Sequence, residues 1–438
     1  MNILQLVIIG IVGFAVSVAI FKRPAVGAAL ILGFVHFERV LVFNGISLVK
    51  LLSIICIGIL VFRVLSMGKG LRFDLTTWLI ALFMAWISIT VFWSSNQTNI
   101  LSELVSLILQ SLMYFLIINL VRSKDDLKLA LWGHVIGGSV MAVILSSTMI
   151  SLNFVRSTDL EIGGLGINLA ARMVGLNLLL AVILFQIDER RLAKIILIGV
   201  AIVSGVGSLL ALSRGNWYAL IMSAIALFIV LNLKKGYKFP FKQILLIAAI
   251  GLVTLYVANR YIFSDYGLSK LQERSESAIT FSDGASGRFG IWQTAFTPFM
   301  ENPIFGNGFN TFKRLNEWKH TGAHNAFVLI AVEDGLVGVL LFSLVLGSVF
   351  LSLVNLLKKE HGNPIALGWG MALFVFLGTV SLVDSAVNRK YLWFVLGIIS
   401  LLVFYYGDTQ SSEESAVEIA SAGNIKAVKQ LAYFEKSG

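Results

Sequence analysis

Long apolar runs, separated by short polar segments, repeat along the whole chain. Each run has about the length that carries an α-helix across the hydrocarbon core of a bilayer, roughly 20 residues. The runs lack the strict alternation of apolar and polar positions that marks the strands of a transmembrane β-barrel. Hydropathy therefore predicts thirteen helical spans, at residues 3–21, 25–43, 46–65, 75–93, 101–121, 129–151, 168–187, 192–212, 216–233, 243–262, 335–357, 364–384 and 390–406.

The second of these runs, 25–43, is the weakest, because Glu38 and Arg39 interrupt it. A re-entrant or interfacial segment is the alternative interpretation of this run. It would reduce the total to twelve spans and change the side of the membrane on which the N-terminus lies.

Composition supports a membrane protein. Of the 438 residues, 57% are hydrophobic and only 13% are charged, and the mean hydropathy is +0.87. A soluble domain carries roughly a quarter of charged residues. The predicted fold class is therefore all-α, a polytopic transmembrane helix bundle of about 12–13 spans with one large non-cytoplasmic loop that carries short amphipathic helices. The single cysteine, Cys56, lies inside an apolar run and has no partner for an internal disulfide.

Basic residues collect in alternate loops, which sets the predicted orientation. By the positive-inside rule these loops face the cytoplasm. The same rule explains most of the net charge of +10, so this charge does not indicate nucleic-acid binding. The loops in question contain Lys22, Arg23, Arg63, Lys69, Arg72, Arg122, Lys124, Lys128, Arg190, Arg191, Lys194, Lys234, Lys235, Lys238, Lys242, Lys358 and Lys359.

One connection, residues 263–323, is far longer than the others, since most inter-helix loops have only a few residues. The alternation of loops places it outside the cytoplasm. We therefore expect a transmembrane region at 1–262 with the first ten spans and a periplasmic loop with short helices at 263–334. The last three spans follow at 335–406, and a polar cytoplasmic tail at 407–438.

Arg214 lies in a very short outer turn, Ser-Arg-Gly-Asn-Trp at 213–217. An arginine at a membrane edge can simply reach the lipid headgroups. Against that, this arginine is on the side where it gives no topology signal, and a tight turn fixes its position. Trp217 beside it suits an interfacial anchor.

Arg288 begins a stretch with apolar residues at 289, 292, 295, 296 and 299, the spacing of an amphipathic helix on the membrane surface. Pro298 and Pro303 limit this helix. A guanidinium near a helix N-terminus favours an anion. The alternative is an arginine that meets only solvent or lipid headgroups.

A turn-rich segment with two glycines, at 302–309, precedes His324. The glycines fit tight turns, and phosphate binding by their backbone is the weaker interpretation. A single helix over 324–357 would be about 50 Å long, well beyond the bilayer core of about 30 Å. We therefore expect a break near Asp334-Gly335, with His324 starting a short outer helix. Histidine is the commonest general base, although a helix-terminal polar residue without a catalytic part is the alternative.

Other kinds of chemistry have little support in the sequence. The five histidines are scattered, and no acidic pair stands at ligand spacing, so no metal site and no cofactor is expected. A nucleotide-binding glycine loop is likewise not evident. Nothing further assigns a function from residue types alone.

Four stretches, in this order, resemble the O-antigen ligase and polymerase superfamily of bacterial envelope glycosyltransferases. They are Gly-Ile-Asn-Leu-Ala at 166–170, Ser-Arg-Gly at 213–215, the run from 288–292 to 302–308, and His-Asn at 324–325 followed by 333–338. The likeness is strongest over 160–345. The family implies metal-independent, inverting glycosyl transfer at the periplasmic face of the bacterial inner membrane, from a glycan on undecaprenyl diphosphate.

The resemblance also implies roles for individual residues. Arg214 and Arg288 would hold the diphosphate, and His324 would act on the acceptor hydroxyl. The predicted substrate-binding residues are Asn168, Arg172, Trp292, Asn325 and Glu333.

The favoured hypothesis is a repeat-unit polymerase for O-antigen or exopolysaccharide. The alternative is an O-antigen ligase that moves glycan to lipid A-core, since both share these motifs. A chain-length regulator is a further expected partner, besides the bilayer itself. A flippase for the same lipid-linked glycans is the alternative of another class, but such a transporter should bury ionisable residues at mid-membrane. The predicted spans hold few.

Overall fold

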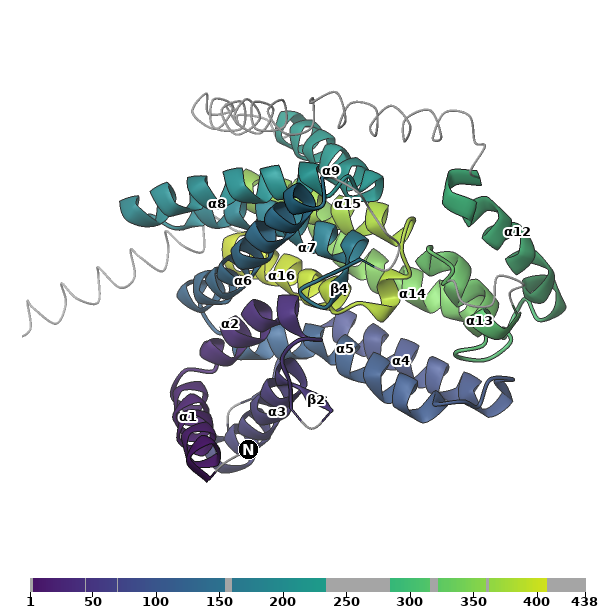
Figure 1. Ribbon diagram of the computed structural model, residues 1–438, viewed down its shortest axis with the longest axis horizontal. Coiled ribbons are helices and arrows are strands. Elements are labelled where there is room, and N and C mark those ends of the chain that lie inside the picture. Colours follow the sequence, from purple (N-terminus) through teal and green to yellow (C-terminus); the bar gives the residue numbers. More distant parts are fainter. Residues whose placement is uncertain are drawn as a thin grey trace, which may run out of the picture.

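The structure is a computed structural model that describes residues 3–43, 45–68, 70–153, 160–233, 284–315, 322–359 and 362–407. It is a bundle of α-helices, as predicted, with two hairpins of two-residue strands (Figure 1). The α-helices are α1 (Ile3–Lys22), α2 (Ala25–Phe34), α3 (Leu48–Met67), α4 (Leu75–Thr90), α5 (Ile100–Leu120), α6 (Lys124–Ser151), α7 (Ile167–Ile187), α8 (Arg191–Leu210), α9 (Arg214–Leu233), α12 (Gly284–Glu301), α13 (Phe312–Leu315), α14 (Ala326–Lys358), α15 (Pro364–Ser381) and α16 (Lys390–Tyr406).

Short 3-10 turns and hairpins connect some of these helices. The turns are η1 (Val35–Phe37), η2 (Val91–Trp93) and η3 (Ala386–Asn388). Strand β1 (Val42–Phe43) pairs antiparallel with β2 (Ile46–Ser47), and β3 (Glu161–Ile162) pairs antiparallel with β4 (Leu165–Gly166).

In the part of the chain that the structure describes, nine helices are long and apolar enough to cross a membrane, and three shorter apolar helices accompany them. Each predicted span within these residues corresponds to a helix. The predicted span at 243–262 lies outside the described residues, as do 263–283 and 316–321 of the long connection and the tail from 408 on.

The weak second run forms a short helix rather than a full-length span. Helix α2 has only ten residues and ends in η1, before the charged pair Glu38 and Arg39. It nevertheless joins the two ends of the bundle. Arg23, just before it, pairs with Asp126 at the start of α6, and Glu38, just after it, pairs with Lys390 at the start of α16.

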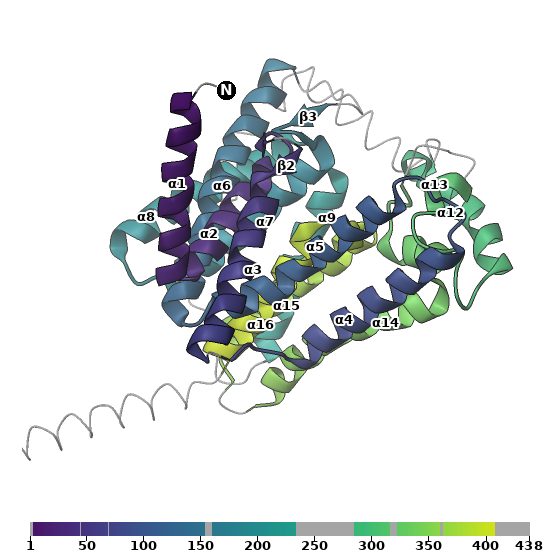
Figure 2. The ribbon, with the colours of Figure 1, turned by 90° about the horizontal axis from the view of Figure 1, so that it is seen from below.

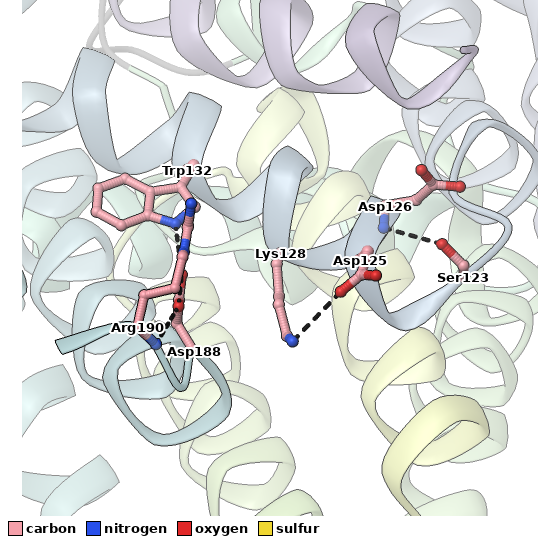
Figure 3. Close-up of polar contacts among 7 residues, drawn as sticks. All are labelled: Ser123, Asp125, Asp126, Lys128, Trp132, Asp188 and Arg190. Carbon is pink, nitrogen blue, oxygen red and sulfur yellow. Dashed lines mark hydrogen bonds and ion pairs between the residues drawn. The ribbon is translucent and has the colours of Figure 1, made fainter. Parts of the chain in front are cut away.

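Within the described residues, the loops rich in basic residues and the remaining loops lie at opposite ends of the bundle. At the end rich in basic residues, Arg190 Nη2 lies 2.7 Å from Asp188 Oδ2, which also accepts a hydrogen bond from Trp132. Lys128 pairs with Asp125 beside them, at the start of α6 (Figure 3). At the other end Figure 2 shows β2, β3, α12 and α13. We call the end of the bundle with β2, β3, α12 and α13 the outer end. That this end faces the periplasm is a prediction.

Helix α7 lies at the centre of the bundle, and 83% of the residues in its most apolar stretch are buried. It contacts α6, α8, α9 and α15, so its first turns are held rigidly at the outer end. Inside the bundle the structure brings together His36 and His134, whose rings are 4.6 Å apart between centroids. His134 Nδ1 lies 3.3 Å from the side-chain oxygen of Asn177 on α7.

The break predicted near Asp334-Gly335 is present. Within α14, Gly335 adopts φ 68° and ψ −169°, which divides the helix into a short outer part and a long span. A Cβ atom at Gly335 would lie 2.2 Å from the carbonyl oxygen of Ile304, so only glycine fits there. The backbone of 303–308 hydrogen-bonds to this kink, with Leu336 N donating to Pro303 O at 2.8 Å.

The amphipathic helix predicted around Arg288 is α12. It continues through Pro298 to Glu301, so Pro303 rather than Pro298 follows its end. Ile291 and Ala295 are buried, but Phe296, expected on the same apolar face, is 61% exposed. The contact of α12 with α14 determines which residues are buried.

Candidate active site at the outer end

An ion pair between Arg172 and Asp384 forms the centre of the outer end. Arg172 Nη1 lies 2.6 Å from Asp384 Oδ2, and both side chains are almost fully buried. The guanidinium also donates to the carbonyl oxygen of Val383 at 3.2 Å. Arg172 is on the second turn of α7, and Asp384 is in the connection between α15 and α16. The pair thus ties the central helix to this connection.

Four groups act on the Asp384 carboxylate. Burial alone would raise the pKa of Asp384, but the charges of Arg172 and Arg389 lower this pKa below its ordinary value. The Tyr391 hydroxyl donates to the carboxylate at 3.1 Å and acts in the same direction. A charge on His324 also lowers the pKa of Asp384, so His324 lies within electrostatic reach of this carboxylate.

The turn with Arg214 adjoins the same connection. Ser213 Oγ donates to Asn168 Oδ1 at 3.2 Å, one turn before Arg172 on α7. A Cβ atom at Gly215 would lie 3.0 Å from a methyl group of Val383. Arg214 is the first residue of α9 and is half-buried. The start of α9 is thus packed between α7 and the residue next to Asp384.

His324 lies in the segment that precedes α14 and passes close to the α15–α16 connection, since a Cβ atom at Gly322 would lie 3.7 Å from Ser385 Oγ. The sequence predicted that His324 starts the outer helix, but His324 precedes this helix. Its backbone is in the left-handed region, with φ 48°. Asn325 is the N-cap of α14, and its side-chain oxygen accepts from Phe327 N at 2.9 Å and from Val328 N at 3.2 Å. This cap fixes the direction in which the chain leaves His324.

Helix α12 joins the site through Trp292. The indole Nε1 donates to the carbonyl oxygen of Ala323, next to His324, at 2.9 Å. Arg288 is one turn earlier on the same helix, and its side chain is outside the part of the chain whose side chains are described. Its backbone therefore follows the helix that is anchored beside His324.

Glu333, in the short outer part of α14, contacts the turns at 306–312. Its carboxylate accepts from Phe312 N at 3.0 Å, and its carbonyl oxygen accepts from Gly308 N at 2.8 Å. Gly306 and Gly308 have positive φ values of 75° and 93° in this region. The glycines of 302–309 thus serve tight turns around the kink. These contacts do not bring Glu333 to the Asp384 carboxylate.

Asp384 and Arg389 are the members of the site that sequence reasoning missed. Both lie where the predicted span 364–384 ends and the predicted span 390–406 has not yet begun. The signal available in the sequence was an acidic residue at the end of an apolar run. Its significance appears only once Arg172, more than 200 residues away, is placed beside it. Within the described ranges, no three side chains of His, Cys, Asp or Glu gather closely enough to hold a metal ion.

Part of the chain that contains the candidate site is similar to known proteins. Residues 199–343, about a third of the chain, match the family model described as O-antigen ligase. This stretch includes Arg214, Arg288 and His324. The chain is also 28% identical over 135 residues to the exopolysaccharide production protein ExoQ of Rhizobium meliloti (strain 1021). That match covers 26% of this chain and 31% of the length of that relative. The predicted resemblance to the O-antigen ligase and polymerase superfamily is thus confirmed by the match over residues 199–343 and by the distant similarity to ExoQ.

Proposed function

We propose that this protein is an envelope polysaccharide glycosyltransferase of the bacterial inner membrane, with its active site facing the periplasm. It transfers or polymerises glycan repeat units that are carried on undecaprenyl diphosphate. The observation that supports this most is that three segments meet at Asp384 and its chain neighbours. Arg172 of α7 pairs with Asp384, Gly215 at the start of α9 packs against Val383, and Gly322, just before α14, lies next to Ser385, while Trp292 joins α12 to Ala323. Segments far apart in the sequence thus meet at one end of the bundle.

The proposed reaction is a single displacement. The acceptor oxygen forms a bond to the anomeric carbon, and the bond from that carbon to the diphosphate oxygen breaks with inversion. Arg214 and Arg288 hold the diphosphate, whose negative charge grows as the sugar departs. Guanidinium groups suit this role because they stay charged and donate two hydrogen bonds to one phosphate. The proton of the acceptor hydroxyl passes to His324 as general base.

Asp384 is proposed as a positioning residue for His324. An imidazole that takes a proton becomes cationic, and a nearby carboxylate stabilises that state. The carboxylate is available because Arg172 and Arg389 keep Asp384 ionised. Asn168, Arg172, Trp292 and Asn325 are proposed to position the substrate near Arg214, Arg288 and His324. The predicted role of Glu333 in substrate binding is proposed to be indirect, through the turn that its carboxylate holds at Phe312 N.

A repeat-unit polymerase is favoured over a ligase that moves glycan to lipid A-core. The relative is named for exopolysaccharide production, which favours polymer synthesis. A chain-length regulator would then be a further partner. The alternative of another class, a flippase for lipid-linked glycans, has one specific observation in its favour. The histidines His36 and His134 are buried together inside the bundle, and buried ionisable groups in a membrane protein often mark transport pathways.

The proposal is tested by alanine variants in cells that depend on this protein for polysaccharide. Arg214→Ala, Arg288→Ala and His324→Ala should each lower polymer output about 10²–10³-fold while the protein still accumulates. Arg214→Lys should fail as well, because an ammonium cannot reproduce the bidentate fork. The matched control is Lys128→Ala, at the opposite end of the bundle, which should leave the chain-length ladder on a gel unchanged. A normal ladder from all three alanine variants would contradict the proposal.

A further inference from the structure

A cavity of about 600 Å³ lies beside the candidate active site. Its lining residues come from the hairpin β1–β2, from the starts of α3 and α16, and from α5 and α7. This volume is within the range of small-molecule sites, roughly 300–1,000 Å³. Four basic and two acidic side chains line it, namely Arg39, Lys50, Arg389, Lys390, Glu38 and Glu161.

The charges of this cavity are only partly paired with one another. Glu38 pairs with Lys390, which is 8% exposed, and it also accepts a hydrogen bond from Ser47 at 3.2 Å. At the rim, Arg39 Nη1 lies 3.3 Å from Glu161 Oε1, with both side chains more than half exposed. The surplus of basic groups favours a negatively charged ligand.

The other lining groups fit a sugar. Ser106 and Gln110 on α5 supply a hydroxyl and an amide, which are groups that hydrogen-bond to hydroxyls. Leu169 and Met173 on α7 supply an apolar wall, against which the C–H faces of a sugar ring can pack. Most of the lining side chains are polar or charged, which suits a ligand with many hydroxyl groups rather than an apolar one.

Arg389 connects the cavity with the active site. It lines the cavity, and its Nε lies 3.5 Å from the Asp384 carboxylate. A sugar in the cavity would therefore have one end close to the carboxylate that lies within electrostatic reach of His324.

We propose that the cavity binds the terminal sugars of the acceptor glycan and recognises an acidic sugar among them. This assignment rests on the proposed function, because it takes the glycan as the acceptor of that reaction. The carboxylate of the acidic sugar meets Lys50, while Arg39 and Glu161 form the entrance.

Binding measured without a donor tests this inference separately from catalysis. The purified full-length protein in lipid nanodiscs is titrated with a β1,4-linked tetrasaccharide of glucuronic acid, and with cellotetraose as the neutral probe of equal length, by calorimetry. The wild-type protein should bind the acidic probe more tightly. Lys50→Gln should weaken binding of the acidic probe about ten-fold, the loss of one charge-assisted hydrogen bond, and leave the neutral probe unaffected. Lys50→Arg should retain most of the affinity.

Glu161→Gln provides a change in the opposite direction. It releases exposed Arg39 from its partner, so the acidic probe should bind about two- to five-fold more tightly, which a folding defect cannot imitate. Equal affinity for both probes, or affinities that neither substitution changes, would overturn the inference. Arg214→Ala should keep wild-type binding of the acidic probe while it loses polymer synthesis. A failure of the cavity therefore remains distinguishable from a failure of the proposed reaction.

Discussion

Replacing Asp384 with asparagine should destabilise the outer end of the bundle more than an ordinary surface substitution would. The variant keeps the shape of the side chain but removes its charge. Arg172, only 5% exposed, then keeps a buried charge that the neutral amide and the carbonyl oxygen of Val383 do not compensate. Breaking a buried ion pair by removing one partner costs about 3–5 kcal/mol, because the other charge is left uncompensated.

The expected change is measurable as an unfolding temperature of the purified protein in detergent. With an unfolding entropy of about 2 cal/mol/K per residue, a chain of 438 residues shifts its Tm by about 1 °C for each kcal/mol. Asp384→Asn should therefore lower the Tm by about 3–5 °C. The double variant Arg172→Met with Asp384→Leu should recover most of this loss, because apolar residues of similar volume replace the pair.

The pH dependence of the same comparison follows from the lowered pKa of Asp384. A carboxyl group whose folded-state pKa is depressed stabilises the fold above its unfolded-state pKa, about 4. That contribution is lost as the pH falls through the folded-state pKa. The Tm difference between the wild type and Asp384→Asn should thus be full at neutral pH and shrink below about pH 4. Equal Tm values at neutral pH would refute the account of this ion pair.

Two further substitutions test how α14 and α12 are held. Gly335→Ala should lower the Tm, because at this positive φ the new Cβ would lie 2.2 Å from the carbonyl oxygen of Ile304. Gly347→Ala, on the same helix but with open space around the new Cβ, should leave the Tm unchanged. Similar Tm values for the two variants would contradict the tight packing at the kink. Trp292→Phe removes the hydrogen bond to the carbonyl oxygen of Ala323, worth about 1 kcal/mol. This variant should lower the transfer rate several-fold with little change in Tm. An unchanged rate would show that this bond does not position His324.

Much of the fold could be predicted from the sequence because it depends on local properties. Apolar runs determine the spans. Helix α14 is too long to cross the bilayer core as one straight helix, and the Asp334-Gly335 turn determines where it breaks. The short helix α2 also follows from a local cause, the charges of Glu38 and Arg39.

The centre of the candidate site could not be predicted in this way. The contact of Arg172 with Asp384 joins residues that no local pattern relates. The same holds for His36 and His134, which no local pattern relates and which meet because α2 packs along α6. His324 shows the limit in detail, because its left-handed backbone and its exclusion from the helix depend on the cap formed by Asn325.

The most direct test of the central claim uses the purified protein and a synthetic undecaprenyl-diphosphate oligosaccharide. We expect the wild-type protein to extend the glycan and to release undecaprenyl diphosphate, which marks a polymerase, whereas transfer only to lipid A-core would mark a ligase. Arg214→Ala, Arg288→Ala and His324→Ala should each release undecaprenyl diphosphate at about 10²–10³-fold lower rates. Wild-type rates of release from all three variants would contradict a shared catalytic site at the outer end of the bundle.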